Sequence, residues 1–350
     1  MITIEVKASR AYNVLIGSGL LPTLGQRIKE IKTVQKVALV SDSNVFPLYG
    51  GSVTASLEQS GFQVVPFVFP AGEESKNAQT YLELLNFLAE NQLTRSDCMV
   101  ALGGGVVGDL TGFAAATYLR GIPYVQVPTT LLAAVDSSVG GKTAIDLPLG
   151  KNLVGAFNQP ALVLCDIDTL NTLPEDIFRD GCAEVIKYGV LYDPELLAHL
   201  SEKGIDFQRE AVIARCVELK RNVVMEDEFD TGARMKLNLG HTIGHGVEAQ
   251  SNYAVAHGKA VAIGMCIAAR AAAGKDYCCA EVRDQIIQTV ATFGLPTKIH
   301  YTAQALFTSA LSDKKRSGGH VDLIVPYGIG DCRILPMELS EVQSFIQAGL

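Results

Sequence analysis

The pattern of hydrophobic residues changes near residue 170, and this change limits the folds that the chain can adopt. Before it, β-rich runs alternate with helical patterns, which is typical of a mostly parallel sheet with helices on both faces. The predicted strands are 36–41, 63–69, 98–102, 124–127 and 161–166, and the predicted helices among them are 78–91 and 106–119. After residue 174 we predict helices at 175–192, 194–203, 208–225, 239–250, 259–273 and 280–293, then strands near 321–326 and 332–336 and a short terminal helix.

A chain of 350 residues is longer than one hydrophobic core usually supports, so we predict two domains. The first is α/β and spans residues 1–170, and the second is mostly helical and spans residues 171–350. The sequence contains no internal repeat, and no low-complexity linker separates the two predicted domains.

Composition narrows the classes of protein that remain. A formal net charge of −8 argues against a nucleic-acid surface, which needs a basic stripe. No apolar run approaches the roughly 20 residues of a membrane span, and residues 1–6 alternate like a strand rather than a signal peptide. The eight cysteines show no Cys-x-x-Cys pair, so we expect reduced thiols and a cytoplasmic protein.

Three of the six histidines, His241, His245 and His257, fall close together. On a helix, His241 and His245 stand four residues apart and share one face. Imidazole is the commonest metal ligand near neutral pH, and a carboxylate often completes a catalytic zinc site. A single histidine of this kind is more often a satisfied interior residue. Three of them flanked by glycines favour a metal or phosphate site.

A glycine-rich turn follows the predicted strand 98–102. Gly103, Gly105 and Gly108 fit the G-x-G-x-x-G pattern, in which the backbone approaches a pyrophosphate at a helix N-terminus. A tight strand-to-helix turn explains the pattern about as well. No acidic residue follows about 20 positions later to hold a ribose. Asp42, at the end of an earlier strand, is the candidate for that role.

Glycines, hydroxyl groups and two lysines occur together in residues 128–143 and 150–157. We predict irregular chain there, in which Lys142 and Lys151 bind phosphates or carboxylates. The alternative is an ordinary polar loop with solvated lysines.

In combination, these motifs resemble the 3-dehydroquinate synthase family of the shikimate pathway. The resemblance runs from about residue 37 to residue 330 and rests on segments 72–76, 103–108, 128–146, 150–160, 181–189, 238–245, 257–258 and 313–315. It implies an α/β Rossmann-like nucleotide-binding domain joined to a mostly α-helical metal- and substrate-binding domain. It also implies NAD, a divalent metal (zinc or cobalt) and a homodimer.

The resemblance implies a phosphate-eliminating carbon–oxygen lyase. Its substrate would be 3-deoxy-D-arabino-heptulosonate 7-phosphate, and its products 3-dehydroquinate and phosphate. The implied steps are transient oxidation at C5 by NAD, elimination of phosphate, return of the hydride, ring opening and an intramolecular aldol closure. NAD would therefore not be consumed.

The resemblance also implies roles for particular residues. The metal ligands would be Glu184, His241 and His257. The catalytic residues would be His245, Lys142, Asn152 and Asp230. The substrate-binding residues would be Asp136, Lys142, Asn152, Lys187, Lys220, Arg234, Asn238, His245, Lys314 and, from the partner subunit, Arg120. The NAD contacts would be Asp42, Glu73, Lys76, Gly105, Val106, Val107, Gly108, Asp109, Thr129, Thr130, Lys142, Lys151, Thr169, Leu170, Asn171 and Thr172.

The sequence departs from the family pattern at two positions. Asp230 stands where relatives usually carry the glutamate that accepts a proton, and Lys259 stands where many carry glutamate. Either Lys314 or Lys315 would face the substrate.

Three other functions are open at this stage: another sugar-phosphate cyclase, a metal-dependent NAD polyol dehydrogenase, and a non-catalytic NAD-binding regulator. The many predicted anion-binding lysines disfavour the dehydrogenase, and the intact metal-ligand trio disfavours the regulator.

Overall fold

The computed structural model describes residues 1–31, 34–314 and 320–350, without the side chains of 309–314. The chain divides into two compact units, residues 1–173 with 209–229, and residues 174–208 with 230–350. The first unit therefore includes helix α7 (Arg209–Glu226), which the predicted limits of 1–170 and 171–350 had assigned to the second. Helix α7 packs on the first two strands of the chain, and these contacts group it with the first unit.

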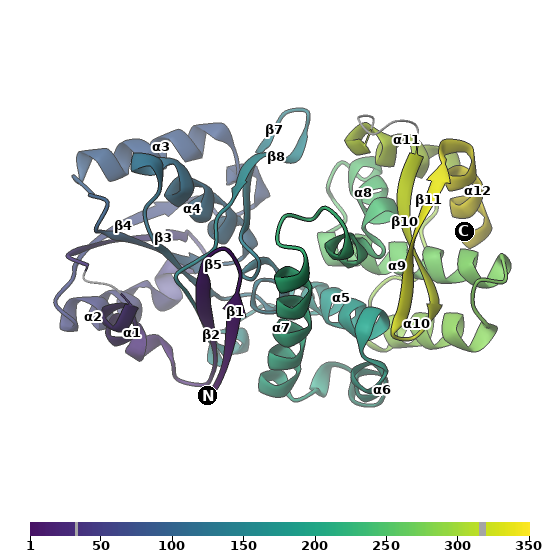
Figure 1. Cartoon of the computed structure of the whole chain (residues 1–350), viewed down its shortest axis with the longest axis horizontal. Coiled ribbons are helices and arrows are strands. Elements are labelled where there is room, and N and C mark those ends of the chain that lie inside the picture. Colours follow the sequence, from purple (N-terminus) through teal and green to yellow (C-terminus); the bar gives the residue numbers. More distant parts are fainter. Residues whose placement is uncertain (32–33, 315–319) are drawn as a thin grey trace. The chain divides into compact units, whose positions relative to one another are not determined.

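Within the described residues, the first unit contains a seven-stranded sheet (Figure 1). Only the first two strands pair antiparallel with each other, and the remaining neighbours pair parallel. The prediction of a mostly parallel sheet is confirmed, although the second strand was not predicted. The strands lie in the order β1 (Ile2–Lys7), β2 (Ala11–Gly17), β9 (Leu162–Asp166), β6 (Tyr124–Pro128), β5 (Cys98–Gly103), β3 (Lys36–Asp42) and β4 (Gln63–Phe69).

Helices cover both faces of this sheet. Helices α1 (Leu24–Ile31) and α2 (Gly51–Gln59) pack on one face, and α3 (Ala78–Glu90) and α4 (Gly105–Thr117) pack on the other. The sequence of strand β5 is continuously apolar because its side chains are buried on both faces of the sheet. Val100 and Leu102 point into the α1–α2 core, while Met99 and Ala101 point into the α3–α4 core.

The strand order reverses between β3 and β5. The chain runs from β3 outward to β4 and then returns to the other side of β3. The carboxyl ends of β3, β5 and β6 therefore open on a switch point, the position at which open α/β sheets bind ligands. The lysine-bearing segment after β6 was predicted to be irregular, and this was wrong. Its two lysines lie on an antiparallel hairpin of β7 (Lys142–Leu147) and β8 (Gly150–Phe157).

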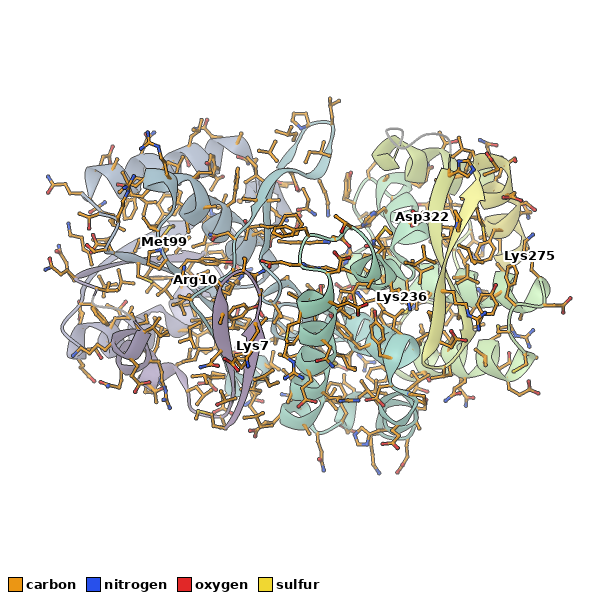
Figure 2. The ribbon with its side chains drawn as sticks, viewed as in Figure 1. Lys7, Arg10, Met99, Lys236, Lys275 and Asp322 are labelled. Carbon is orange, nitrogen blue, oxygen red and sulfur yellow. The ribbon has the colours of Figure 1, made fainter. Side chains whose placement is uncertain are left out.

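The second unit is mostly helical. Its elements are α5 (Glu175–Tyr192), α6 (Pro194–Lys203), α8 (His241–Gln250), α9 (His257–Gly274), α10 (Ala280–Thr292), α11 (Ala303–Lys314), α12 (Leu339–Gly349) and the hairpin of β10 (His320–Gly328) and β11 (Asp331–Glu338). The hairpin packs beside α9 and α12 (Figure 1), and exposed charges such as Lys275 and Asp322 lie on the surface (Figure 2).

Helix α9 is the most buried of these helices, because it contacts α5, α8, α10 and α12. Glycines allow its close approach to α8. A Cβ on Gly264 would lie 2.0 Å from the carbonyl oxygen of Gly240, which itself has a φ of 78°. Despite its apolar character, neither α9 nor any other helix in the described residues meets the length and hydropathy needed to span a bilayer.

A buried carboxylate joins two strands of the first unit. Asp97 precedes β5, and its oxygens accept hydrogen bonds from the backbone N–H of Lys36 (2.9 Å) and from the N–H and hydroxyl of Thr94 (2.7 and 2.8 Å). Burial raises the pKa of Asp97, but these hydrogen bonds more than offset it and hold that pKa below its ordinary value.

We expect Asp97→Ala to lower the free energy of unfolding at pH 7 by about 2–4 kcal/mol, since it removes three hydrogen bonds to a charged acceptor. The folded-state pKa lies below the unfolded value of about 3.9. The stabilisation is therefore present above that pH and is lost as the pH falls through the folded-state pKa. Urea unfolding between pH 3 and 7 measures the difference. The exposed control Glu58→Ala should change stability by less than about 0.5 kcal/mol.

Candidate active site

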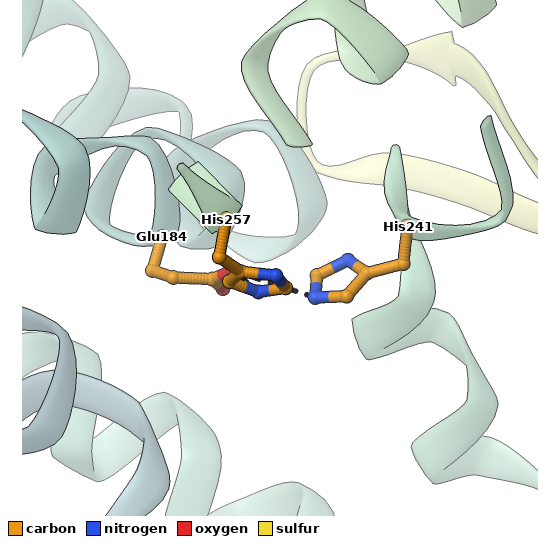
Figure 3. A group of neighbouring side chains, drawn as sticks. All are labelled: Glu184, His241 and His257. Carbon is orange, nitrogen blue, oxygen red and sulfur yellow. Dashed lines mark ion pairs between the residues drawn. The ribbon is translucent and has the colours of Figure 1, made fainter. Parts of the chain in front are cut away.

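Three helices of the second unit bring Glu184, His241 and His257 together (Figure 3). Glu184 lies in the middle of α5, whereas the two histidines are the first residues of α8 and α9. The Nε2 atoms of His241 and His257 lie 3.4 and 3.6 Å from the same oxygen, Oε1 of Glu184. Side chains from distant parts of the sequence thus converge on one buried carboxylate.

The start of α9 is fixed against α5 by Asp180. Its Oδ1 accepts the backbone N–H of Lys259 at 2.8 Å. A Cβ on Gly258 would lie 1.9 Å from the carbonyl oxygen of Asp180, so the approach requires glycine. Asp180 lies one helical turn before Glu184 on α5. Because His257 directly precedes Gly258, the contact also fixes the position of His257.

Burial and charge set the protonation of the site. Glu184 and Lys187 are each 1% exposed and form an ion pair on one face of α5. Burial, reinforced by Lys187, lowers the pKa of His241 to about 3, so its imidazole is neutral. Burial also opposes the charge on His257, but hydrogen bonds and charges from Glu184 and Glu248 raise its pKa to about 10 in the absence of a cation.

The group fits a tetrahedral metal ion. Bonds of about 2.05 Å to such an ion separate its ligand atoms by about 3.4 Å, close to the two measured distances. Two histidines and one glutamate form a known catalytic zinc set that leaves a fourth position open. A second group, His245, Glu248 and His257, shares one histidine with the first, and the candidate ligand atoms within each group lie within 4.8 Å of one another.

Other predicted residues of the second unit lie on segments next to this group. Arg234 and Asn238 belong to the short helix η8 (Ala233–Asn238), which leads into α8, and Arg234 is 2% exposed. Asp230 precedes η8 with a φ of 58°. His245 lies on α8 with its ring centroid 5.8 Å from that of His241. Lys314 ends α11, but its side chain lies outside the described residues, as does the whole of Lys315.

In the first unit, Lys76 is the centre of a polar cluster. Its Nζ lies 2.6 Å from both Asp109 Oδ2 and Asn152 Oδ1, and Glu73 lies 3.9 Å away. Burial opposes the charge on Lys76, but Asp109 and Glu73 raise its pKa. Burial raises the pKa of Asp109, which Lys76 only partly offsets. Lys151 also approaches Glu73, at 3.8 Å. The cluster therefore joins four predicted NAD contacts and one predicted catalytic residue.

The glycine turn, residues 103–108, joins β5 to α4 and directly precedes Asp109 of this cluster. A Cβ on Gly108 would lie 2.4 Å from the side chain of Gln126, so the third glycine permits close packing of α4 on β6. Gly105 and Val106 begin the helix, whereas the side chain of Val107 packs into the core. The N–H of Thr129 donates to the Gly103 carbonyl at 3.0 Å, and Thr130 follows it.

Two further predicted NAD segments lie at strand ends. Asp42 ends β3, and its Oδ1 accepts the N–H groups of Asn44 and Val45 at 2.8 and 2.9 Å. The segment after β9 forms the short helix η6 (Ile167–Asn171), which contains Thr169, Leu170 and Asn171 and is followed by Thr172. The hydroxyl of Tyr49 contacts Thr172 and donates to the Thr169 carbonyl at 3.1 Å. Tyr49 was not among the predicted NAD contacts.

Besides Asn152, the predicted substrate residues of the first unit are Asp136, Lys220, Lys142 and Arg120. Nζ of Lys220, on α7, lies 2.9 Å from Asp136 Oδ1 and donates to the Asp136 carbonyl at 2.7 Å. Lys142 is exposed at the start of β7. Arg120 is exposed with a φ of 66°. The structure therefore pairs Asp136 with Lys220.

Sequence reasoning assigned no role to two carboxylates at the metal-type group, Asp180 and Glu248. Their spacing was a usable signal. Asp180 precedes Glu184 by four residues, and Glu248 follows His241 by seven, so each shares a helix face with a predicted ligand.

Comparison with known proteins gives the wider context. The family model described as 3-dehydroquinate synthase N-terminal matches residues 66–180, and the C-terminal model matches residues 181–316. The 3-dehydroquinate synthase of Pelobacter propionicus is 48% identical over 340 residues, 95% of each chain. That of Streptococcus suis is 44% identical over 343 residues, 96% of this chain and 97% of the relative.

A solved structure is similar over the whole chain. It is 2-deoxy-scyllo-inosose synthase complexed with carbaglucose-6-phosphate, NAD+ and Co2+, with a TM-score of 0.90, 25% identity and 100% of both chains covered. The fold and the histidine–carboxylate group thus define an enzyme of the sugar-phosphate cyclase class. Within that class, the chain belongs to the 3-dehydroquinate synthase family.

We expect His257→Ala to abolish stoichiometric zinc binding, because it removes one of the three converging donors while leaving the helix intact. Zinc content after equilibrium dialysis, with circular dichroism to confirm folding, measures this. The exposed His300→Ala should retain zinc. Unchanged zinc content in His257→Ala would remove His257 from the ligand set.

Proposed function

We propose that this enzyme converts 3-deoxy-D-arabino-heptulosonate 7-phosphate to 3-dehydroquinate and phosphate. The observation that carries the proposal is the convergence of Glu184, His241 and His257, at distances suited to a divalent cation. Identity of 44–48% to 3-dehydroquinate synthases over nearly the whole chain supports this choice of substrate.

The reaction uses NAD and a divalent cation, zinc or cobalt. When bound, NAD accepts a hydride from C5 and returns it, and the cation polarises the hydroxyls at C4 and C5. We assign the cation to Glu184, His241 and His257, and NAD to the switch point of the first unit. The reversal of strand order between β3 and β5 supports the second assignment. The similar cyclase structure is complexed with NAD+ and Co2+, which supports the use of both groups.

We assign substrate binding to a set of cationic and polar side chains. Lys187, Lys220 and Arg234 are each 5% exposed or less. Glu184 and Asp136 pair with Lys187 and Lys220, and cations held in this way form charge-assisted hydrogen bonds to a carboxylate and a phosphate, the two anionic groups of the substrate. The remaining members of the proposed set are Asp136, Lys142, Asn152, Asn238 and Lys314.

We propose that His245 moves protons near the departing phosphate rather than binding the cation. It shares a face of α8 with His241, and its ring lies 6.3 Å from that of His257. Histidine is the side chain that most often acts as a general acid or base. Asp230 is the proposed second proton acceptor, with a reach one methylene shorter than that of glutamate.

We also propose a homodimer in the cytoplasm. The exposed side chain of Arg120 supports a role at the phosphate of a partner subunit. All eight cysteines are free thiols, which fits a reducing compartment.

Purified protein with the heptulosonate phosphate, NAD and zinc should release phosphate while absorbance at 340 nm stays flat, since the hydride is returned in every turnover. Phosphate release is measured with and without a chelator, and the chelator should stop it. Steady accumulation of NADH would instead indicate a polyol dehydrogenase. Phosphate release from another sugar phosphate, but not from the heptulosonate phosphate, would indicate another sugar-phosphate cyclase.

We expect His245→Ala to keep stoichiometric zinc but to slow phosphate release by about 100-fold or more, the usual contribution of a general acid or base. Parallel measurement of zinc content and phosphate release in one preparation checks this. Loss of zinc from this variant would contradict the assignment and make His245 a ligand.

A further inference from the structure

The imidazole of His257 lies between two buried carboxylates. Its Nε2 is 3.6 Å from Oε1 of Glu184, and its Nδ1 is 3.5 Å from Oε1 of Glu248. Glu184 comes from α5 and Glu248 from α8, and the two residues are 1% and 3% exposed. A neutral imidazole carries one proton, so only one of its nitrogens offers a lone pair to a cation.

The neighbouring ligand shows which nitrogen that is. Nδ1 of His241 lies 3.1 Å from the carbonyl oxygen of Leu239, which only accepts hydrogen bonds. The proton of His241 is therefore on Nδ1, and its Nε2 faces Glu184 at 3.4 Å. His257 repeats this arrangement, with the carboxylate of Glu248 in place of the carbonyl of Leu239.

We propose that Glu248 is a positioning residue for the metal site. Its carboxylate accepts the Nδ1–H of His257, which leaves Nε2 without a proton and directed at Glu184. Hydrogen bonding of this kind fixes the tautomer and ring orientation of a histidine ligand and makes it more basic. The inference rests on the metal ligands proposed above.

Charge balance supports the same role. Glu184 and Glu248 place two carboxylates in the buried interior, and Lys187 supplies one cation within the ion pair with Glu184. Buried carboxylates are costly unless compensated. A divalent cation at Nε2 compensates Glu184 directly, and the Nδ1–H of His257 passes part of that positive charge to Glu248.

The rival role for Glu248 is that of a metal ligand. His245, Glu248 and His257 form the second candidate donor group, in which the cation would occupy the Nδ1 side of His257. The two roles require opposite tautomers of His257, and the tautomer can be measured.

The test compares metal affinity in the full-length protein, stripped with a chelator and titrated with Zn²⁺ against a chromophoric competitor. We expect Glu248→Gln and Glu248→Ala to weaken zinc binding by roughly 10–100-fold, with the glutamine variant nearer the lower limit because its amide oxygen still accepts a hydrogen bond. Glu184→Gln should lose stoichiometric zinc. Glu281→Gln, exposed on α10, should bind like the wild type.

The second measurement is ¹⁵N NMR of the zinc-loaded protein labelled at histidine, with the resonances assigned by backbone-to-side-chain correlation. We expect zinc at Nε2 and a proton at Nδ1 of His257 in the wild type. Zinc at Nδ1 would overturn the proposal and make Glu248 a ligand. Wild-type affinity and an unchanged Nδ1–H resonance in both Glu248 variants would also overturn it. If Glu248→Ala does not fold, Glu248→Gln alone decides.

Failure of the proposed metal set would look different. In that case the wild type would bind no zinc, or Glu184→Gln would bind it as tightly as the wild type.

Discussion

The interaction on which the second unit depends is the compensation of one buried carboxylate, that of Glu184. Lys187 pairs with it along the same helix, and the imidazoles of His241 and His257 approach it from two other helices. A carboxylate that is 1% exposed is tolerated only with such partners. The two imidazoles belong to the first residues of α8 and α9, so both helices begin beside Glu184.

The first unit is organised in a comparable way around a buried cation. Lys76 is 4% exposed and contacts the carboxylate of Asp109 and the amide of Asn152, which come from helix α4 and strand β8. One charge thus holds together segments that lie far apart in the sequence. Both units use a buried charge to order polar groups, and polar groups that are ordered before the ligand arrives bind it with less loss of entropy.

Polar groups ordered in this way suit a reaction in which NAD accepts a hydride from the substrate and later returns it. Such chemistry needs a cofactor and a cation held in fixed positions, with protons moved by groups that do not bind the cation. The proposed roles meet this requirement, with His257 as a ligand of the cation and His245 as the group that transfers protons. The ring centroids of the two histidines lie 6.3 Å apart, and Nε2 of His257 faces Glu184.

Much of the fold could be predicted from the sequence, because the spacing of apolar residues along the chain indicates which side chains are buried. The predicted helices 175–192 and 194–203 and the strand 63–69 match α5, α6 and β4 at both ends. Strand β2 and the β7–β8 hairpin were missed, since pairing with a distant or exposed strand leaves little local signal. The resemblance to the family also predicted Glu184, His241 and His257 as one group, and the structure brings these three side chains together. Only tertiary structure decided that Asp180 fixes the start of α9 and that Glu248 faces Nδ1 of His257, because contacts between helices depend on packing that no single segment encodes.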